Sequence, residues 1–111
     1  MKIKKEGRIK DIGNVKKVNF VGEAIGLMFS RRQKADSLLF EFKKPTEIKI
    51  HSYFVFFSFI AIWLDKESNI IELRKIKPFE ISNGIKKPYF KLIEIPINEK
   101  NKERIKLLVG D

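Results

Sequence analysis

The sequence predicts an all-β fold: a compact β-sandwich or jelly-roll-like barrel of short, mostly antiparallel strands with one or two short helical turns. Polar and apolar residues alternate with period two in several segments, which is typical of half-buried strands. Residues 50–64 carry no formal charge when the single histidine is neutral, and they are rich in aromatic and β-branched side chains. Such side chains fit a pleated sheet better than a helix. Short polar segments with Asn, Gly or Pro separate these runs, as turns between strands require.

The first half of the chain contains the earliest strands. The segment VKKVNFV, residues 15–21, is expected to form a short one. In SLLFEFKKP, every second residue from Leu38 to Phe42 should share a face, and Pro45 should end the strand. The apolar segment IHSYFVFFSFIAIWLD, residues 50–65, is predicted to form two successive buried strands or one long strand that bends near its middle.

Three further strands are expected in the second half. In NIIELRKI, Ile71 and Leu73 should share a face and alternate with the charged side chains. In YFKLIEIP, the alternation places Tyr89 and Glu94 on opposite faces. The segment RIKLLVGD, residues 104–111, has the same period and is predicted to be the last strand.

Turns and short helices are expected between the strands. The polar segment 65–69 and the Ser-Asn-Gly segment 82–84 are predicted turns. EAIGLMF, residues 23–29, could form two helical turns, and NEKNKER, residues 98–104, could form a short helical turn on the surface.

The chain is strongly basic, with 24 Lys and Arg, 14 Asp and Glu, and a formal net charge of +10. Half of this excess lies in residues 1–17. We therefore expect a single domain, residues 1–111, made of a basic N-terminal segment (1–17) and a β core (18–111). A basic segment can bind an acidic partner such as nucleic acid, or it can form a solvated surface. The candidate nucleic-acid-contacting residues are Lys2, Lys4, Lys5, Arg8, Lys10, Lys16 and Lys17.

The sequence gives no support to several other classes of protein. It contains no cysteine, which excludes disulfides and cysteine-ligated metals and is compatible with the cytoplasm, where we expect the protein to be. The uncharged run is shorter than the roughly 20 residues of a spanning helix, so no transmembrane segment is expected. No phosphate-binding glycine loop, nucleophile elbow or HExxH pair is present. We therefore predict no catalytic residue, no metal site and no cofactor.

Several segments form a recognisable set in their order and spacing: GLMF, LLFEF, IHSYFVFFSFIAIWLD, NIIEL, KPF, YFKLIEIP and the terminal GD. Together they resemble the prokaryotic domain-of-unknown-function family 192, also catalogued as uncharacterised protein family 0127. The resemblance runs from about Val18 to Asp111. It implies a compact β-sandwich resembling a jelly roll, in agreement with the strand pattern. It implies no activity, because the family has no established biochemical function.

Two polar residues of the central apolar segment match the family pattern and are the candidate ligand-binding residues: His51, in an Ile-His pair, and Asp65, in a Leu-Asp pair. Elsewhere the chain departs from that pattern. Relatives commonly have Pro-Ile-Asp where residues 58–60 are Ser-Phe-Ile, and Ser30 intervenes between GLMF and the arginine expected close behind it. An acidic side chain that relatives carry at position 60 is therefore missing here.

Three functions remain open. The leading hypothesis is a non-enzymatic β-domain that binds an unidentified small molecule or protein partner. The second is an electrostatic nucleic-acid-binding protein that uses the N-terminal lysines, although no RNA-binding aromatic signature accompanies them. The third is an enzyme of unrecognised type near His51, for which an imidazole at the edge of the core is the simpler interpretation.

Overall fold

The structure is a computed structural model that describes residues 1–18, 37–46, 58–77, 85 and 87–109. Its strands are β1 (Lys2–Lys5), β2 (Arg8–Asp11), β3 (Lys16–Val18), β4 (Leu38–Thr46), β5 (Phe59–Leu64), β6 (Ile70–Ile76) and β7 (Tyr89–Pro96). A 3₁₀ helix, η2 (Glu99–Asn101), and an α-helix, α2 (Lys102–Val109), follow the last strand.

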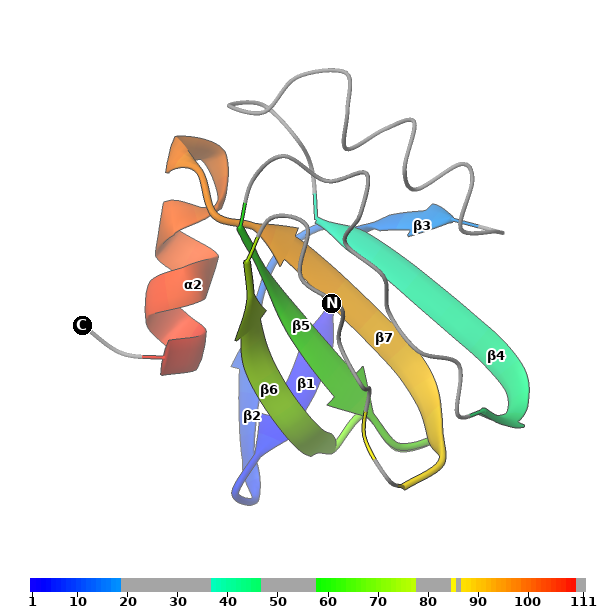
Figure 1. The fold of residues 1–111 in the computed structure, drawn as a ribbon. Helices are drawn as coiled ribbons and strands as arrows, with labels where there is room; N and C mark the ends of the chain where they lie inside the picture. Colours follow the sequence, from blue (N-terminus) through cyan, green and yellow to red (C-terminus); the bar gives the residue numbers. More distant parts are fainter. Residues whose placement is uncertain (19–36, 47–57, 78–84, 86, 110–111) are drawn as a thin grey trace.

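Five strands form one sheet in the order β3-β4-β7-β5-β6 (Figure 1). β3 runs parallel to β4, and every other neighbouring pair in this sheet is antiparallel. β1 and β2 form a separate antiparallel hairpin. The predicted all-β fold, with mostly antiparallel strands and short helical segments, is confirmed.

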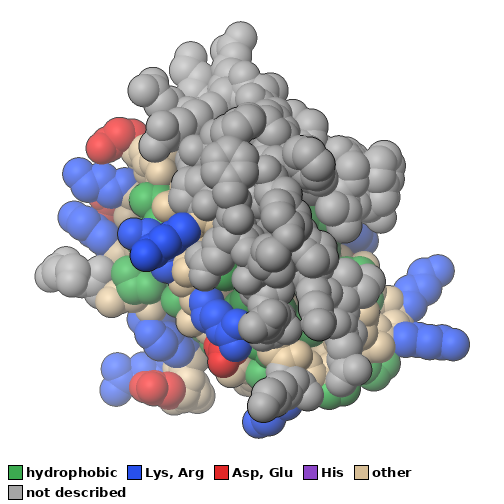
Figure 2. Space-filling view, in the orientation of Figure 1, with side chains coloured by type: hydrophobic (Ala, Val, Ile, Leu, Met, Phe, Trp, Pro, Cys, Tyr) green, Lys and Arg blue, Asp and Glu red, His purple; other side chains and the backbone are tan. Residues whose placement is uncertain are grey.

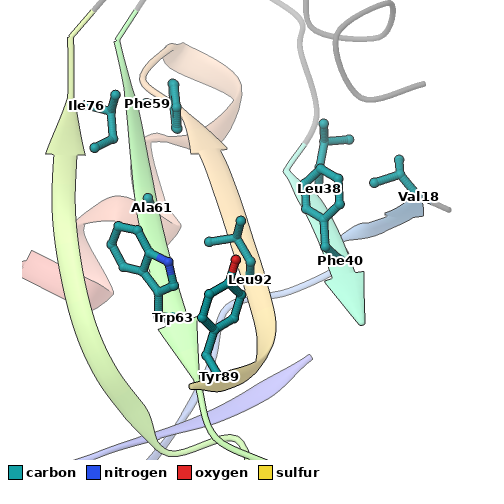
Figure 3. Close-up of a cluster of buried hydrophobic side chains, with 9 residues drawn as sticks. All are labelled: Val18, Leu38, Phe40, Phe59, Ala61, Trp63, Ile76, Tyr89 and Leu92. Atoms are coloured by element: carbon teal, nitrogen blue, oxygen red, sulfur yellow. The ribbon is translucent and has the colours of Figure 1, made fainter. Parts of the chain in front are cut away.

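The five-stranded sheet contributes alternate residues to two hydrophobic clusters, as expected for strands with apolar side chains on both faces. On one face, here called the helix face, the cluster contains Ile3, Ile12, Leu39, Ile60, Ile62, Leu64, Ile93, Ile95 and Leu108. On the other, here called the aromatic face, it contains Val18, Leu38, Phe40, Phe59, Ala61, Trp63, Ile76, Tyr89 and Leu92 (Figure 3). All six residues of β5 are buried, which confirms the expected burial of this part of the apolar run.

The C-terminal segment is a helix, and the prediction of a strand at residues 104–111 is wrong. Asn98 caps the helical region, because its side chain accepts a hydrogen bond from the backbone N–H of Asn101 at 3.0 Å. The buried Leu108 and the partly buried Ile105 are three residues apart, so both reach the helix face. Leu107, which the strand pattern placed together with Ile105, is 48% exposed. The helical turn expected at residues 98–104 corresponds to η2 and the start of α2.

Three details of the strand predictions are wrong. Ile71 and Leu73 pack against opposite faces, because the register of β6 shifts next to the pair formed by Leu64 and Ile70. Tyr89 was predicted to lie on the face opposite Glu94, but it belongs to the aromatic face, the same face as Glu94. β4 continues through Pro45 to Thr46, across a register shift against β7.

The basic N-terminal segment folds as a hairpin that the charge pattern did not predict. Its two-residue turn consists of Glu6 and Gly7, which both have positive φ (52° and 79°), the geometry of a type I′ turn. Ile3 and Ile12 are 1% and 2% exposed and pack on the helix face of the main sheet. The segment therefore contributes to the hydrophobic core as well as to the charge of the surface.

Some sequence predictions fall outside the described residues. These are the helical turns at 23–29, the turn at 82–84, the first part of the long apolar segment and the candidate His51.

Candidate functional site

Asp65, one of the two candidate ligand-binding residues, organises the turn between β5 and β6. Its Oδ1 accepts hydrogen bonds from the backbone N–H groups of Glu67 (2.9 Å) and Asn69 (2.8 Å), and its Oδ2 accepts one from the Asn69 side-chain amide (3.0 Å). Burial alone would raise the pKa of Asp65, but these hydrogen bonds outweigh it, and the pKa lies below its ordinary value. Both carboxylate oxygens are therefore engaged within the turn, and ligand binding by Asp65 stays a prediction.

Two of the seven N-terminal basic residues bind the end of α2. The ammonium of Lys5 donates to the carbonyl of Leu108 at 2.6 Å, and that of Lys10 donates to the carbonyl of Leu107 at 2.6 Å. The last carbonyls of a helix have no intrahelical partner and carry partial negative charge. These two lysines thus anchor the hairpin to the C-terminal turn of α2.

The other five candidates lie at the surface. Lys17 forms an ion pair with Glu41 at 3.2 Å. Lys2, Lys4, Arg8 and Lys16 are exposed and make no side-chain ion pair with any residue in the described ranges. In the view of Figure 2, the described Lys and Arg side chains are scattered around the outline of the molecule. Of the seven basic residues, two therefore bind the helix end, one is ion-paired and four are exposed without an ion pair to a described residue.

Replacing Lys5 with methionine should lower the free energy of unfolding by about 1 kcal/mol, because the variant keeps the apolar stem but loses the ammonium bound to the helix end. The measurement is the urea midpoint at constant m-value. Lys2→Met, on the exposed side of the same strand, is the matched control and should change the stability by less than about 0.5 kcal/mol. Equal losses in the two variants would contradict the anchoring role.

Glu94 is a carboxyl group buried on the aromatic face of the sheet. It lies in β7 between Leu38 of β4 and Ala61 of β5, its partners in the two registers. The residue is 7% exposed, and its side chain makes no hydrogen bond or ion pair with another described residue. Burial raises the pKa of Glu94 to about 7. Near neutral pH the group can therefore act either as a hydrogen-bond donor or as an anion.

Trp63 brings a second polar group to the same face. Its side chain is fully buried, and within the described part of the chain its indole Nε1 has no hydrogen-bond acceptor. In Figure 3 this nitrogen points toward β7, on the side of Leu92 and Tyr89. The guanidinium of Arg74 lies 5.4 Å from the ring centroid of Trp63, in cation–π contact.

Tyr89 completes this set of buried polar groups. Burial raises the pKa of its hydroxyl to about 12, and the nearby charge of Glu94 adds to the effect. The aromatic face thus combines a titratable carboxyl, an indole N–H and a phenol with an apolar surround. Sequence alternation placed Glu94 on the same side as Leu92 but gave it no role. The signal that could have found it is a lone acidic residue inside the apolar run LIEIP.

The described residues contain no group of three or more His, Cys, Asp or Glu side chains that could hold a metal ion. In the same ranges, no helix is long and apolar enough to cross a membrane.

Comparison with known proteins identifies the family. The model of the family DUF192, described as "Uncharacterized ACR", matches residues 5–111. No curated protein and no solved structure matches the chain. The match covers nearly the whole sequence, including most of the basic hairpin that the resemblance had left outside. The chain therefore belongs to the domain-of-unknown-function family DUF192.

Proposed function

We propose that this DUF192 chain is a non-enzymatic binding domain that takes, on its aromatic face, a small, mostly apolar ligand with a hydrogen-bond acceptor, with Trp63 and Glu94 as the recognising groups. The observation that carries the proposal is the buried indole N–H of Trp63, which has no acceptor among the described residues. A buried donor without a partner costs about 1–3 kcal/mol. A ligand that supplies the acceptor would remove this cost, which gives a physical reason for binding.

The chemistry of the face defines the ligand that would fit. It must offer a hydrogen-bond acceptor to Trp63 and a polar group to Glu94, whose carboxyl can donate or accept according to its protonation. The rest of the ligand should be apolar or aromatic, since the neighbouring side chains include those of Phe59, Ala61 and Leu92. Such sites, mostly apolar with a few placed polar groups, are typical of small-molecule binding. The cysteine-free sequence is compatible with our further proposal that the protein acts in the cytoplasm.

Native mass spectrometry of the gently purified protein tests the proposal without a choice of ligand. We expect an adduct on the 13.1 kDa chain that unfolding in urea removes. Trp63→Phe, which keeps an aromatic ring but loses the N–H, should carry much less of it. Leu107→Ala, on the exposed side of α2, is the control and should retain it. A bare, folded wild-type chain would contradict binding of a retained ligand, and equal adducts in all three proteins would contradict the role of Trp63.

The exposed side chains of Lys2, Lys4, Arg8 and Lys16 favour a second candidate function, electrostatic binding of nucleic acid. If these four cations contact phosphates of single-stranded RNA, log K should fall against log salt with a slope of about −3. Fluorescence anisotropy with a labelled single-stranded RNA measures this. The double variant Lys2→Glu/Lys4→Glu should weaken binding, whereas Lys5→Met should leave it unchanged because Lys5 already binds α2. Absence of binding at low salt would remove this candidate.

A further inference from the structure

The outer edge of β6 is an unpaired edge of the main sheet in the described structure. β6 is the last strand in the order β3-β4-β7-β5-β6, and it pairs with β5 on its inner side. The hairpin bonds to this outer side just before the strand begins, where the backbone N–H of Lys4 donates to the carbonyl of Ser68 at 2.9 Å and Lys4 forms a single bridge with Asn69. β1 also lies close to β6 itself, but the two strands are not paired. From Ile71 to Ile76, no segment of the described chain pairs with this edge.

An unpaired strand edge presents backbone donors and acceptors that can pair with another strand, and charged side chains often protect such edges. In β6 an acidic and a basic residue are separated by one apolar residue. Glu72 and Arg74 lie on either side of Leu73, and they form an ion pair with each other. Their side chains are 38% and 40% exposed, so both are accessible to a second strand.

The sequence of β6 is self-complementary in one antiparallel register. A second copy related by a two-fold axis perpendicular to the sheet must pair residues that lie on the same face. From Glu72 to Ile76, beyond the register shift, the faces alternate regularly, so even-numbered residues must pair with even-numbered ones and odd with odd. When Leu73 of one copy lies opposite Leu73 of the other, Glu72 of each copy lies opposite Arg74 of the other copy. A register centred on Glu72 or on Arg74 would place that residue opposite its own copy, so that like charges face each other, which is unfavourable.

We propose that β6 pairs antiparallel with the β6 of a second copy of this chain, centred on Leu73, so that two five-stranded sheets join into one continuous sheet. Glu72 and Arg74 of the two copies would then form an alternating cluster of four charges on the aromatic face. Pairing from Glu72 to Arg74 avoids both the register shift at Ile71 and the edge that Lys4 covers at Asn69. A single pair of strands buries less area than a standard protein interface, so the dimer should be weak and concentration-dependent.

Sedimentation velocity from low micromolar to near-millimolar concentration tests this proposal. The wild-type protein should shift from one 13.1 kDa chain toward the mass of two. Glu72→Arg and Arg74→Glu should each raise the dissociation constant by about tenfold or more, since each places like charges opposite each other. The double variant Glu72→Arg/Arg74→Glu restores opposite charges and should return the constant to near the wild-type value.

The controls separate loss of pairing from loss of folding. Arg74 also contacts the Trp63 ring, so circular dichroism must show that each variant is folded. Glu72→Arg leaves that contact in place and keeps the test valid if Arg74→Glu does not fold. Glu67→Arg, an exposed charge in the turn before β6, should leave the constant unchanged. The proposal would be overturned if the wild-type protein stayed monomeric at all concentrations. It would also be overturned if the single charge reversals left the dissociation constant unchanged, or if the folded double variant stayed monomeric.

Discussion

Replacing Glu94 with glutamine is expected to stabilise the folded protein by about 3 kcal/mol at mildly alkaline pH. Burial raises the pKa of this carboxyl from its ordinary value of 4.5 to about 7. Above the raised pKa the folded protein must hold a buried anion, which glutamine does not require. Glutamine keeps the size of the side chain and a neutral polar group, so the packing beside Leu38 and Ala61 should be preserved.

The sign of the pH dependence follows from the same shift. Between about pH 4.5 and pH 7 the folded state holds a proton on Glu94 that the unfolded state has released. The wild-type protein should therefore lose this contribution to stability as the pH rises through that window, and Glu94→Gln should not. The pKa values of Asp11 and Asp65 are lowered instead, with ordinary values of 3.8. Their contributions are lost only as the pH falls below this value.

Urea unfolding at a series of pH values, monitored by circular dichroism, measures this effect. Glu67→Gln in the exposed turn before β6 is the control and should follow the wild-type profile to within about 0.5 kcal/mol. Identical profiles for Glu94→Gln and the wild-type protein would show that the carboxyl is not held in an apolar environment. A ligand with a positive charge beside Glu94 would lower its pKa and flatten the wild-type profile, so the series should be repeated with the stripped protein.

Replacing Asn101 with alanine should lower the free energy of unfolding by about 2–4 kcal/mol, the second large effect that we expect. Asn101 is fully buried where η2 meets α2. Its side-chain amide donates to the carbonyl of Pro96 at 2.9 Å and accepts from the hydroxyl of Ser37 at 3.1 Å. In the variant, the Pro96 carbonyl and the Ser37 hydroxyl would lose their hydrogen bonds to Asn101, and a small cavity would form.

The urea midpoint and m-value of Asn101→Ala measure this loss. Ser37→Ala removes one end of the same network and keeps the bond to Pro96, so it should cost less, about 1 kcal/mol. Amide hydrogen exchange should also increase through α2 in Asn101→Ala, because the network holds the start of the helix against β4 and β7. A loss no larger than that of Ser37→Ala would contradict the role of Asn101 in positioning the helix.

Much of the sheet could be predicted from the sequence, because a strand places successive side chains on opposite faces. The alternation from Leu38 to Phe40, and from Leu92 to Ile95, gave the correct faces of β4 and β7. The aromatic content of the long apolar segment identified β5 as buried. The turn at Asp65 followed from its polar composition. These features depend on local chemistry, which the sequence contains directly.

The C-terminal segment shows why local periodicity was insufficient elsewhere. Ile105, Leu107 and Leu108 fit either a strand or one turn of a helix, so their spacing does not decide between them. The tertiary structure decides for the helix. Leu108 packs against the main sheet, and the carbonyls at the helix end bind Lys5 and Lys10 from about one hundred residues away in the chain. The same contacts give a structural role to two lysines that the charge pattern assigned to nucleic-acid contact or to a solvated surface.

By itself, therefore, the sequence determined the β-rich class, the faces of the regular strands and the membership of DUF192. Only the tertiary structure decided the strand order, which places β7 between β4 and β5 and so buries Glu94 beside Leu38 and Ala61. It also left β6 at the edge with its self-complementary charges. The physical reason is that alternation fixes which way a side chain points, whereas burial, pKa and pairing depend on neighbours that are distant in sequence.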